Sequence, residues 1–90
     1  MNYENKWVRF YSEFSRHNNA FIKAFTISNP RVSSSQFRVC AYLKAGYNTR
    51  EIAEEMGLSI RSVESHRYRI RRKLKVKRAE SLIMHLHGQY

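Results

Sequence analysis

One stretch of the chain, SIRSVESHRYRIRRKLKVKR from Ser59 to Arg78, decides the fold. Ser59 follows Gly57 and Leu58, and its side chain can accept a backbone N–H from a first helical turn. No Gly or Pro interrupts residues 60–74, so the stretch predicts a helix about 22 Å long. One side of this helix is apolar and can be buried, while the other presents cationic and hydrogen-bonding side chains. The inward residues are Val63, Ile70 and Leu74, with His66 and Arg67 at the margins; the outward ones are Arg61, Ser65, Tyr68 and Arg72, flanked by Glu64 and Arg69.

The positive charge of the chain is concentrated in the same stretch. Residues 60–78 carry nine Lys and Arg side chains against one acid, Glu64, which leaves +8 of the formal net charge of +10. Like charges one turn apart repel each other, so such a helix is most stable beside a polyanion. Nucleic acid is therefore the first candidate partner. An anionic membrane is less compatible, because the outward face has no apolar stripe free to insert.

The whole chain is long enough for one small domain and too short for two, at 90 residues. Its hydrophobic share of 42% is that of a folded domain rather than a disordered basic tail. Cys40 has no second cysteine for a disulfide or a zinc cluster, which fits a reducing compartment and a thiol packed as a small hydrophobe. No apolar window approaches a membrane span and the start has no signal-peptide character, so we expect a soluble, cytoplasmic protein.

Catalytic and metal-binding patterns are missing from the sequence. It has no evident carboxylate pair, no nucleophile beside a base and no glycine-rich phosphate loop, so we expect neither an enzyme nor a cofactor. His85 and His87 stand two residues apart and do not share a helical face, so we expect no metal site. For His66 we expect a packed, hydrogen-bonded imidazole rather than a ligand or a base.

Aromatic residues at helical spacing mark two helices ahead of Pro30, over residues 3–15 and 20–27. We expect Asn19 to cap the second helix and Asn29, which Pro30 pushes out of the α region, to end it. The aromatic face of the first helix must be covered by something. It can pack on the rest of the domain, which we favour, or form a coiled-coil or dimer seam.

Four more helices follow, and nothing alternates with the period of a strand, which predicts an all-α helical bundle. The third and fourth helices each begin with a capping box and end at a glycine, and the fifth is the cationic helix. The sixth runs from about residue 78 to 87, with Ala79, Leu82, Ile83 and Leu86 on one side. The two capping boxes are Ser33 with Gln36 and Asn48 with Glu51, and the closing glycines are Gly46 and Gly57.

The fourth and fifth helices, separated by Gly57 and Leu58 and followed by a basic run, have the sequence form of a helix-turn-helix. The small side chain of Ala53 lets the two helices approach closely. We expect the angle between them to be filled by Ile52, Leu58, Val63 and Ile70.

Residues 32–87 resemble the LuxR/GerE-type helix-turn-helix of bacterial transcription regulators. The resemblance implies a four-helix bundle whose third helix, residues 60–74, enters the DNA major groove, and whose last helix often mediates dimerisation. Residues 31–90 would then be this domain, and residues 1–30 an N-terminal aromatic helical extension. The chain looks most like versions at the C-terminal ends of larger sensor-regulators of Bacteroidetes. The matching residues are Val32-Ser33-x-x-Gln36, Gly46-x-Asn48-x-x-Glu51-Ile52-Ala53-x-x-Met56, Leu58-Ser59-x-x-Ser62-Val63-x-x-His66 and Arg72-Lys73-Leu74-x-Val76-Lys77-x-Ala79.

Three positions depart from the family pattern. Gln36 stands where Glu is usual and keeps the capping chemistry. Lys75 replaces a usual Gly ahead of the last helix, and the connection after it is one residue short. Glu64 occupies a position that is often basic, so the DNA sequence read by this helix is left open.

The resemblance and the helical faces together give a set of expected DNA contacts. Glu64, Ser65 and Tyr68 are expected to reach base edges, whereas Arg69, Arg72 and Lys75 are expected to meet phosphates. The full set is Thr49, Arg50, Arg61, Ser62, Glu64, Ser65, Tyr68, Arg69, Arg72, Lys75 and Lys77. Leu82, Ile83 and Leu86 exceed what a short terminal helix needs for packing, so we expect them to form the interface of a homodimer on DNA.

Two alternatives to a sequence-specific regulator of transcription stay open at this level. A sigma-factor region of similar helix-turn-helix form would bind promoter DNA together with RNA polymerase. An interaction module or a membrane-surface helix is the third class, and the polar outer face of the cationic helix disfavours it.

Overall fold

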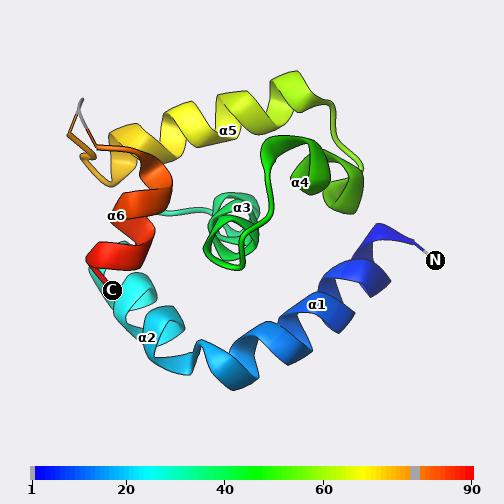
Figure 1. The fold of residues 1–90 in the computed structure, drawn as a ribbon, viewed down its shortest axis with the longest axis horizontal. Helices are drawn as coiled ribbons and strands as arrows, with labels where there is room; N and C mark the ends of the chain where they lie inside the picture. Colours follow the sequence, from blue (N-terminus) through cyan, green and yellow to red (C-terminus); the bar gives the residue numbers. More distant parts are fainter. Residues whose placement is uncertain (1, 78–79) are drawn as a thin grey trace.

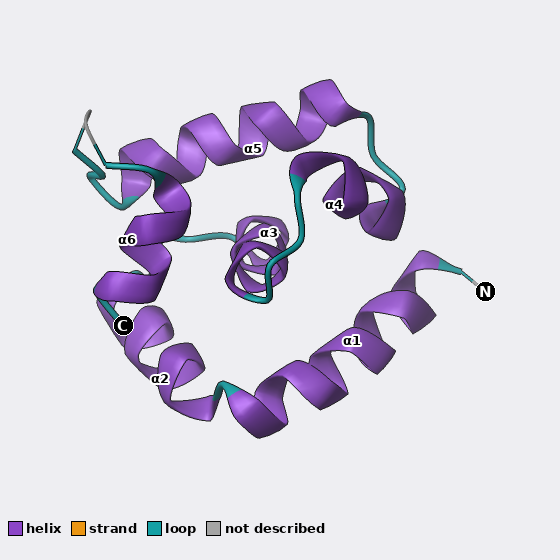
Figure 2. Cartoon of the chain, in the orientation of Figure 1, coloured by secondary structure: helices purple, strands orange, loops and turns teal. Residues whose placement is uncertain are grey.

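The computed structural model describes residues 2–77 and 80–90, and every regular element in this part of the chain is a helix (Figure 2). The all-α prediction is therefore confirmed. The helices are α1 (Tyr3–His17), α2 (Asn19–Ser28), α3 (Ser34–Lys44), α4 (Thr49–Met56), α5 (Ile60–Lys73) and α6 (Leu82–Gly88). Within the described residues, no helix is long and apolar enough to cross a membrane.

Helix α3 is the centre of the bundle, and the other five helices surround it (Figure 1). It begins with the capping box expected from the sequence: Ser33 accepts from the Gln36 backbone N–H at 3.1 Å, and the Gln36 side chain accepts from the Ser33 N–H at 3.0 Å. It ends at Lys44, and Gly46 two residues later closes the turn with a φ of 98° that only glycine adopts easily. Every side chain of its second half from Val39 to Leu43 is fully buried, so α3 contacts neighbours on all sides.

Helices α1 and α2 contribute to the same hydrophobic core as the rest of the chain. Phe14, Phe21 and Phe25 are buried together with the central residues of α3. Phe10 stacks on Tyr42 with ring centroids 4.3 Å apart. The aromatic face of α1 thus packs on its own domain from Trp7 to Phe14, as we favoured, while Tyr3 at the start of the helix is 55% exposed.

The boundary between α1 and α2 differs from the sequence prediction. Asn19 is the first residue of α2 rather than its cap, and Asn18 occupies the cap position without a capping hydrogen bond. The Asn18 side chain instead donates to the Phe14 carbonyl at 3.1 Å and so closes the end of α1. The other end of α2 is as predicted, because Asn29 ends the helix ahead of Pro30.

Helices α4 and α5 form the predicted helix-turn-helix. Asn48 and Glu51 make the capping box of α4, and Gly57 ends this helix in the left-handed conformation with φ of 69°. Ile52, Ala53, Val63 and Ile70 are buried in the hydrophobic core, and Leu58 is half-buried against it. The fold therefore holds α5 against α4 through apolar contacts and leaves the opposite side of α5 free.

The start of the last helix was predicted wrongly. Helix α6 begins at Leu82, about four residues later than expected, because the Ser81 hydroxyl accepts from the Met84 N–H at 3.0 Å and caps it there. The predicted inward position of Ala79 and the start at Arg78 lie outside the described residues. The connection before α6 is held by Arg71, which donates to the carbonyls of Glu80 at 3.0 Å and Lys77 at 3.3 Å.

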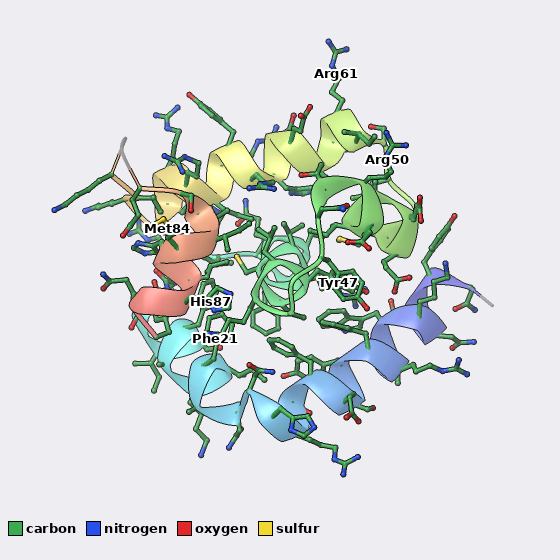
Figure 3. All side chains as sticks on the ribbon, in the orientation of Figure 1. Phe21, Tyr47, Arg50, Arg61, Met84 and His87 are labelled. Carbon is green, nitrogen blue, oxygen red and sulfur yellow. The ribbon has the colours of Figure 1, made fainter. Side chains whose placement is uncertain are left out.

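The apolar side of α6 faces the core of its own chain. Leu82 and Leu86 are 1% and 0% exposed, so they are needed for packing and cannot contact a second copy. The expectation that they form a dimer interface is therefore wrong for these two residues. Ile83 differs, since it is 40% exposed beside the exposed Met84 (Figure 3).

The C-terminal residue returns to α2. The Tyr90 ring packs against Phe21 and Phe25 at centroid distances of 5.9 and 5.3 Å, and its hydroxyl accepts from the Asn29 side chain at 3.0 Å. The last helix and the second helix are consequently tied together across the bundle (Figure 1).

Candidate nucleic-acid interface

The cationic helix α5 is stabilised at both ends by its own sequence. Ser59 caps it by accepting from the Ser62 backbone N–H at 3.0 Å. Arg71, Arg72 and Lys73 lie in the last turn, where the partial negative charge of the helix C-terminus favours cations. The helix dipole thus offsets part of the repulsion among the clustered charges.

The outward side of α5 is an exposed polar surface. Arg61, Glu64, Ser65, Tyr68, Arg69 and Arg72 are all exposed, as the helical spacing predicted. They line an open groove of about 760 Å³ together with Gln36 and Lys73. Figure 3 shows the Arg61 side chain pointing away from the bundle, on the side of the molecule opposite α1. This surface meets solvent along the whole length of the helix.

Glu64 is the single acid on this surface. Within the described residues it makes no ion pair, although Arg61 and Tyr68 are its neighbours on the helix. Its carboxylate oxygens are therefore free to accept hydrogen bonds from a partner.

Tyr68 and Arg72 act as a pair one turn apart. The guanidinium of Arg72 lies 5.8 Å from the centroid of the Tyr68 ring, which is 61% exposed. A cation over an aromatic face is attracted by the ring. The contact restricts where the Arg72 charge can point before any partner arrives.

Two cationic side chains of α5 are hydrogen-bonded to other parts of the same chain. Lys73 donates to the Arg31 carbonyl at 3.0 Å and to the Gln36 side-chain oxygen at 2.9 Å. Arg71 holds the connection to α6. These two residues therefore anchor α5 on the fold, and neither was among the contacts expected from the sequence.

The beginning of α4 lies beside α5. Arg50 is exposed and points away from the bundle (Figure 3), and Thr49 is half-buried. The Thr49 hydroxyl accepts from the Arg67 guanidinium at 2.9 Å. The sequence places Arg67 only at the margin of the buried stripe and indicates no role for it. No local pattern signals a contact between residues so far apart in the chain.

Three other expected residues lie at the ends of α5. Ser62 is half-buried in the first turn, and its hydroxyl accepts from the Ser59 hydroxyl at 3.0 Å. Lys75 and Lys77 are exposed just after the last turn. Lys75 has a φ of 55°, the left-handed conformation for which the family's usual glycine is suited. Lys75 therefore adopts the left-handed backbone conformation that a glycine would adopt at this position.

His66 is half-buried beside the core, but its Nδ1 atom is buried without a hydrogen-bond partner among the described residues. The expected hydrogen bond of this imidazole is thus missing at that nitrogen.

The buried titratable groups lie away from the exposed surface of α5. Burial raises the pKa of the Cys40 thiol to about 12, so it stays protonated and packs as a small apolar side chain. Burial, followed by the nearby Glu55 carboxylate, also raises the pKa of Tyr42 to about 12. Within the described ranges, no three His, Cys, Asp or Glu side chains come together to hold a metal ion.

An exposed cationic helix held against a shorter helix by a glycine turn defines a DNA-binding module of the helix-turn-helix class. The family model described as "Bacterial regulatory proteins, luxR family" matches residues 31–86, more than half of the chain. The chain therefore belongs to this family of DNA-binding transcription regulators, as the resemblance indicated. Helices α1 and α2 lie outside the matched residues. No curated protein and no solved structure matches the chain.

Proposed function

We propose that the chain binds specific sequences of double-stranded DNA in the cytoplasm to regulate transcription, with α5 in the major groove. The observation that carries this proposal is the outward surface of α5, which is exposed, cationic and interrupted by one unpaired acid. The major groove of B-DNA is about 12 Å wide and admits an α-helix. The apolar contacts with α4 hold the helix rigidly, so it can present its side chains in a fixed register.

Base readout is assigned to the middle of the outward surface. Glu64, Ser65 and Tyr68 follow the first turn of α5, whose N-terminal part enters the groove in helix-turn-helix proteins. The free carboxylate of Glu64 can accept from the N4 amino group of cytosine, an interaction worth roughly 1 to 3 kcal/mol of discrimination. A carboxylate is repelled by phosphates, so its place in the middle of a cationic surface favours a role in base selection.

Phosphate binding is assigned to the surrounding cations and to the start of α4. Arg69, Arg72, Lys75 and Lys77 follow the readout residues along α5 and its exit, and Arg61 and Ser62 precede them. Thr49 and Arg50 add the first turn of α4, where backbone N–H groups and the helix dipole attract anions. These contacts set the register of the protein on the duplex without selecting a sequence.

Two copies of the chain are proposed to bind half-sites about one turn of DNA apart. Of the residues expected at the interface, Ile83 alone supports this pairing, because it is exposed on α6 next to Met84. Ile83→Glu should abolish cooperative binding to a two-half-site duplex while leaving binding to a single half-site unchanged. Unchanged cooperativity would exclude this surface as the interface.

Three variants distinguish the residues that read bases from those that bind phosphates. Each variant is used to select bound sequences from random duplex DNA. Glu64→Ala should change the selected bases at one or two positions, and the loss of a negative charge should raise non-specific affinity. Arg72→Ala should weaken binding to all sequences alike and lower the slope of log affinity against log salt by about 0.9. Arg9→Ala is the matched control, because it removes an exposed charge from α1 on the opposite side of the bundle.

The proposal fails if the parent protein enriches no sequence, or if its affinity is the same at low and high salt. If Glu64→Ala kept the parental sequence profile while Arg72→Ala altered it, α5 would sit in the groove in a different orientation, and the two roles would be exchanged.

A further inference from the structure

The contact between Arg67 and Thr49 joins the two helices of the helix-turn-helix at the edge of the DNA-facing surface. The Arg67 guanidinium donates to the Thr49 hydroxyl oxygen at 2.9 Å across 18 residues of sequence. Both side chains are half-buried, so the bond is only partly open to water. Thr49 is the first residue of α4, and Asn48 and Glu51 beside it are occupied in the capping box.

The bond determines what the Thr49 hydroxyl can do. A hydroxyl group has one hydrogen to donate and two lone pairs that accept. Arg67 occupies a lone pair, and the hydroxyl hydrogen has no acceptor in the described part of the chain. The hydroxyl is therefore held as a donor. DNA phosphate oxygens are acceptors only, so a hydroxyl in this state can donate to a phosphate.

The charge of Arg67 stands in an unusual place. The start of a helix carries a partial positive charge, and a cation beside it is disfavoured. Arg67 nevertheless lies at the start of α4, and Arg50 adds a second cation there. The one acidic residue in the first turn of α4 is Glu51, and its side chain accepts from the Asn48 N–H. An anion at this point would relieve the repulsion.

We propose that Arg67 is a positioning residue for DNA binding: it orients the Thr49 hydroxyl toward a DNA phosphate and fixes the start of α4 against α5. This inference rests on the proposed function and adds to it a residue that reaches the phosphate through Thr49. Arg67 itself is turned toward α4 and is not one of the residues that line the groove along α5.

A double-mutant cycle on the selected duplex tests the proposal. The variants are Thr49→Val, which keeps the shape and removes the hydroxyl, Arg67→Met, which keeps the length and removes the donors, and the combination of both. Each single change should weaken DNA binding about tenfold, the effect of losing one hydrogen bond to a charged group. The combination should also weaken binding about tenfold, because the two residues act as one unit.

Two further measurements separate positioning from other roles. The Thr49→Ser variant retains the hydroxyl, so adding Arg67→Met should weaken its DNA binding by the same factor as in the parent. Urea unfolding of every variant gives the folded fraction, to which each affinity is corrected. The salt slope of Thr49→Val and of Arg67→Met should stay close to that of the parent, since neither removes a cation that touches the duplex.

The result that overturns the proposal is additivity. A combined loss of about a hundredfold, with a salt slope about 0.9 lower for Arg67→Met alone, would mean that Arg67 touches a phosphate directly. Unchanged affinity of Arg67→Met would equally remove its role. Failure of the proposed function looks different, because the parent protein itself would then select no duplex, and both proposals would fall.

Discussion

Lys75→Gly should stabilise the domain while weakening its binding to DNA. Lys75 follows α5 with φ of 55°, and the turn is closed by the Lys75 N–H donating to the Arg72 carbonyl at 3.2 Å and the Val76 N–H donating to the Arg71 carbonyl at 3.0 Å. The left-handed conformation costs a residue with a Cβ roughly 1 to 2 kcal/mol. Glycine removes this cost but loses about 0.5 to 1 kcal/mol through the greater freedom of the unfolded chain.

The net gain expected for Lys75→Gly therefore lies between about 0 and 1.5 kcal/mol in the free energy of unfolding, and its midpoint corresponds to roughly 3 to 6 °C in Tm for a domain of this size. Urea and thermal unfolding followed by circular dichroism measure it. Because Lys75 is also assigned a phosphate contact, the same variant should lower the salt slope of DNA binding by about 0.9. Stability and affinity should thus change in opposite directions.

Two matched variants separate the backbone from the charge. Lys75→Ala removes the same charge but keeps a Cβ in the left-handed conformation, so it should lose DNA affinity without gaining stability. Lys77→Gly removes a neighbouring exposed charge and adds a glycine where φ is not positive, so it should not gain stability. If Lys75→Gly were no more stable than Lys75→Ala, the strain assigned to this residue would be absent and the reasoning would be refuted.

Gly57 has φ of 69°, and a Cβ there would lie 2.5 Å from the Tyr3 ring. The left-handed backbone alone should make Gly57→Ala cost about 1 to 2 kcal/mol in the free energy of urea unfolding, and the clash with Tyr3 adds to that cost. In this variant Tyr3→Ala should recover only the steric part, and full recovery would show that the backbone is unstrained. The free energy of unfolding should fall as the pH rises from about 9 toward 12. The folded state keeps protons on Cys40 and Tyr42, each with a pKa of about 12, whereas the unfolded chain releases these protons at their ordinary pKa values of 9 and 10. Tyr42→Phe should lessen this fall, and an unchanged pH profile in this variant would contradict the assignment. A fragment of residues 31–90 should show no cooperative thermal unfolding. It lacks the three buried phenylalanines of α1 and α2, and losing one such side chain costs about 3 to 5 kcal/mol. A sharp transition like that of the full chain would show that the matched region folds alone.

Local signals in the sequence predicted most of the fold. The capping boxes at Ser33 and Asn48 and the closing glycines Gly46 and Gly57 depend on residues within one turn of each other, and all four were predicted correctly. The helical spacing likewise predicted which side of α5 is exposed, because the pattern is set by the helix itself.

The two errors on α6 have different causes. Its start was misplaced because a local signal was missed: Ser81 caps the helix by accepting from the Met84 N–H three residues later. An apolar stripe on a short helix does not reveal whether its own core or a second molecule covers it, so Leu82 and Leu86 were assigned to the wrong surface.

Two cationic side chains of α5 have partners that the sequence did not predict. Lys73 and Arg67 were not among the expected DNA contacts, and they bind Gln36 and Thr49, which no spacing rule connects to them. Sequence alone therefore predicted the exposed side of α5 and missed which of its cations are hydrogen-bonded within the fold.

The return of Tyr90 to α2 has a consequence for how the bundle folds. Its hydrogen bond with Asn29 spans 61 residues, whereas the helix-turn-helix is built from neighbouring segments. Local contacts form fastest, and a long loop must close before a distant contact stabilises anything. We expect α3, α4 and α5 to assemble early in refolding and the seam between α2 and the C-terminal residue to close last. The same seam should be the first to open, so amide hydrogens of α2 should exchange with solvent sooner than those of α3.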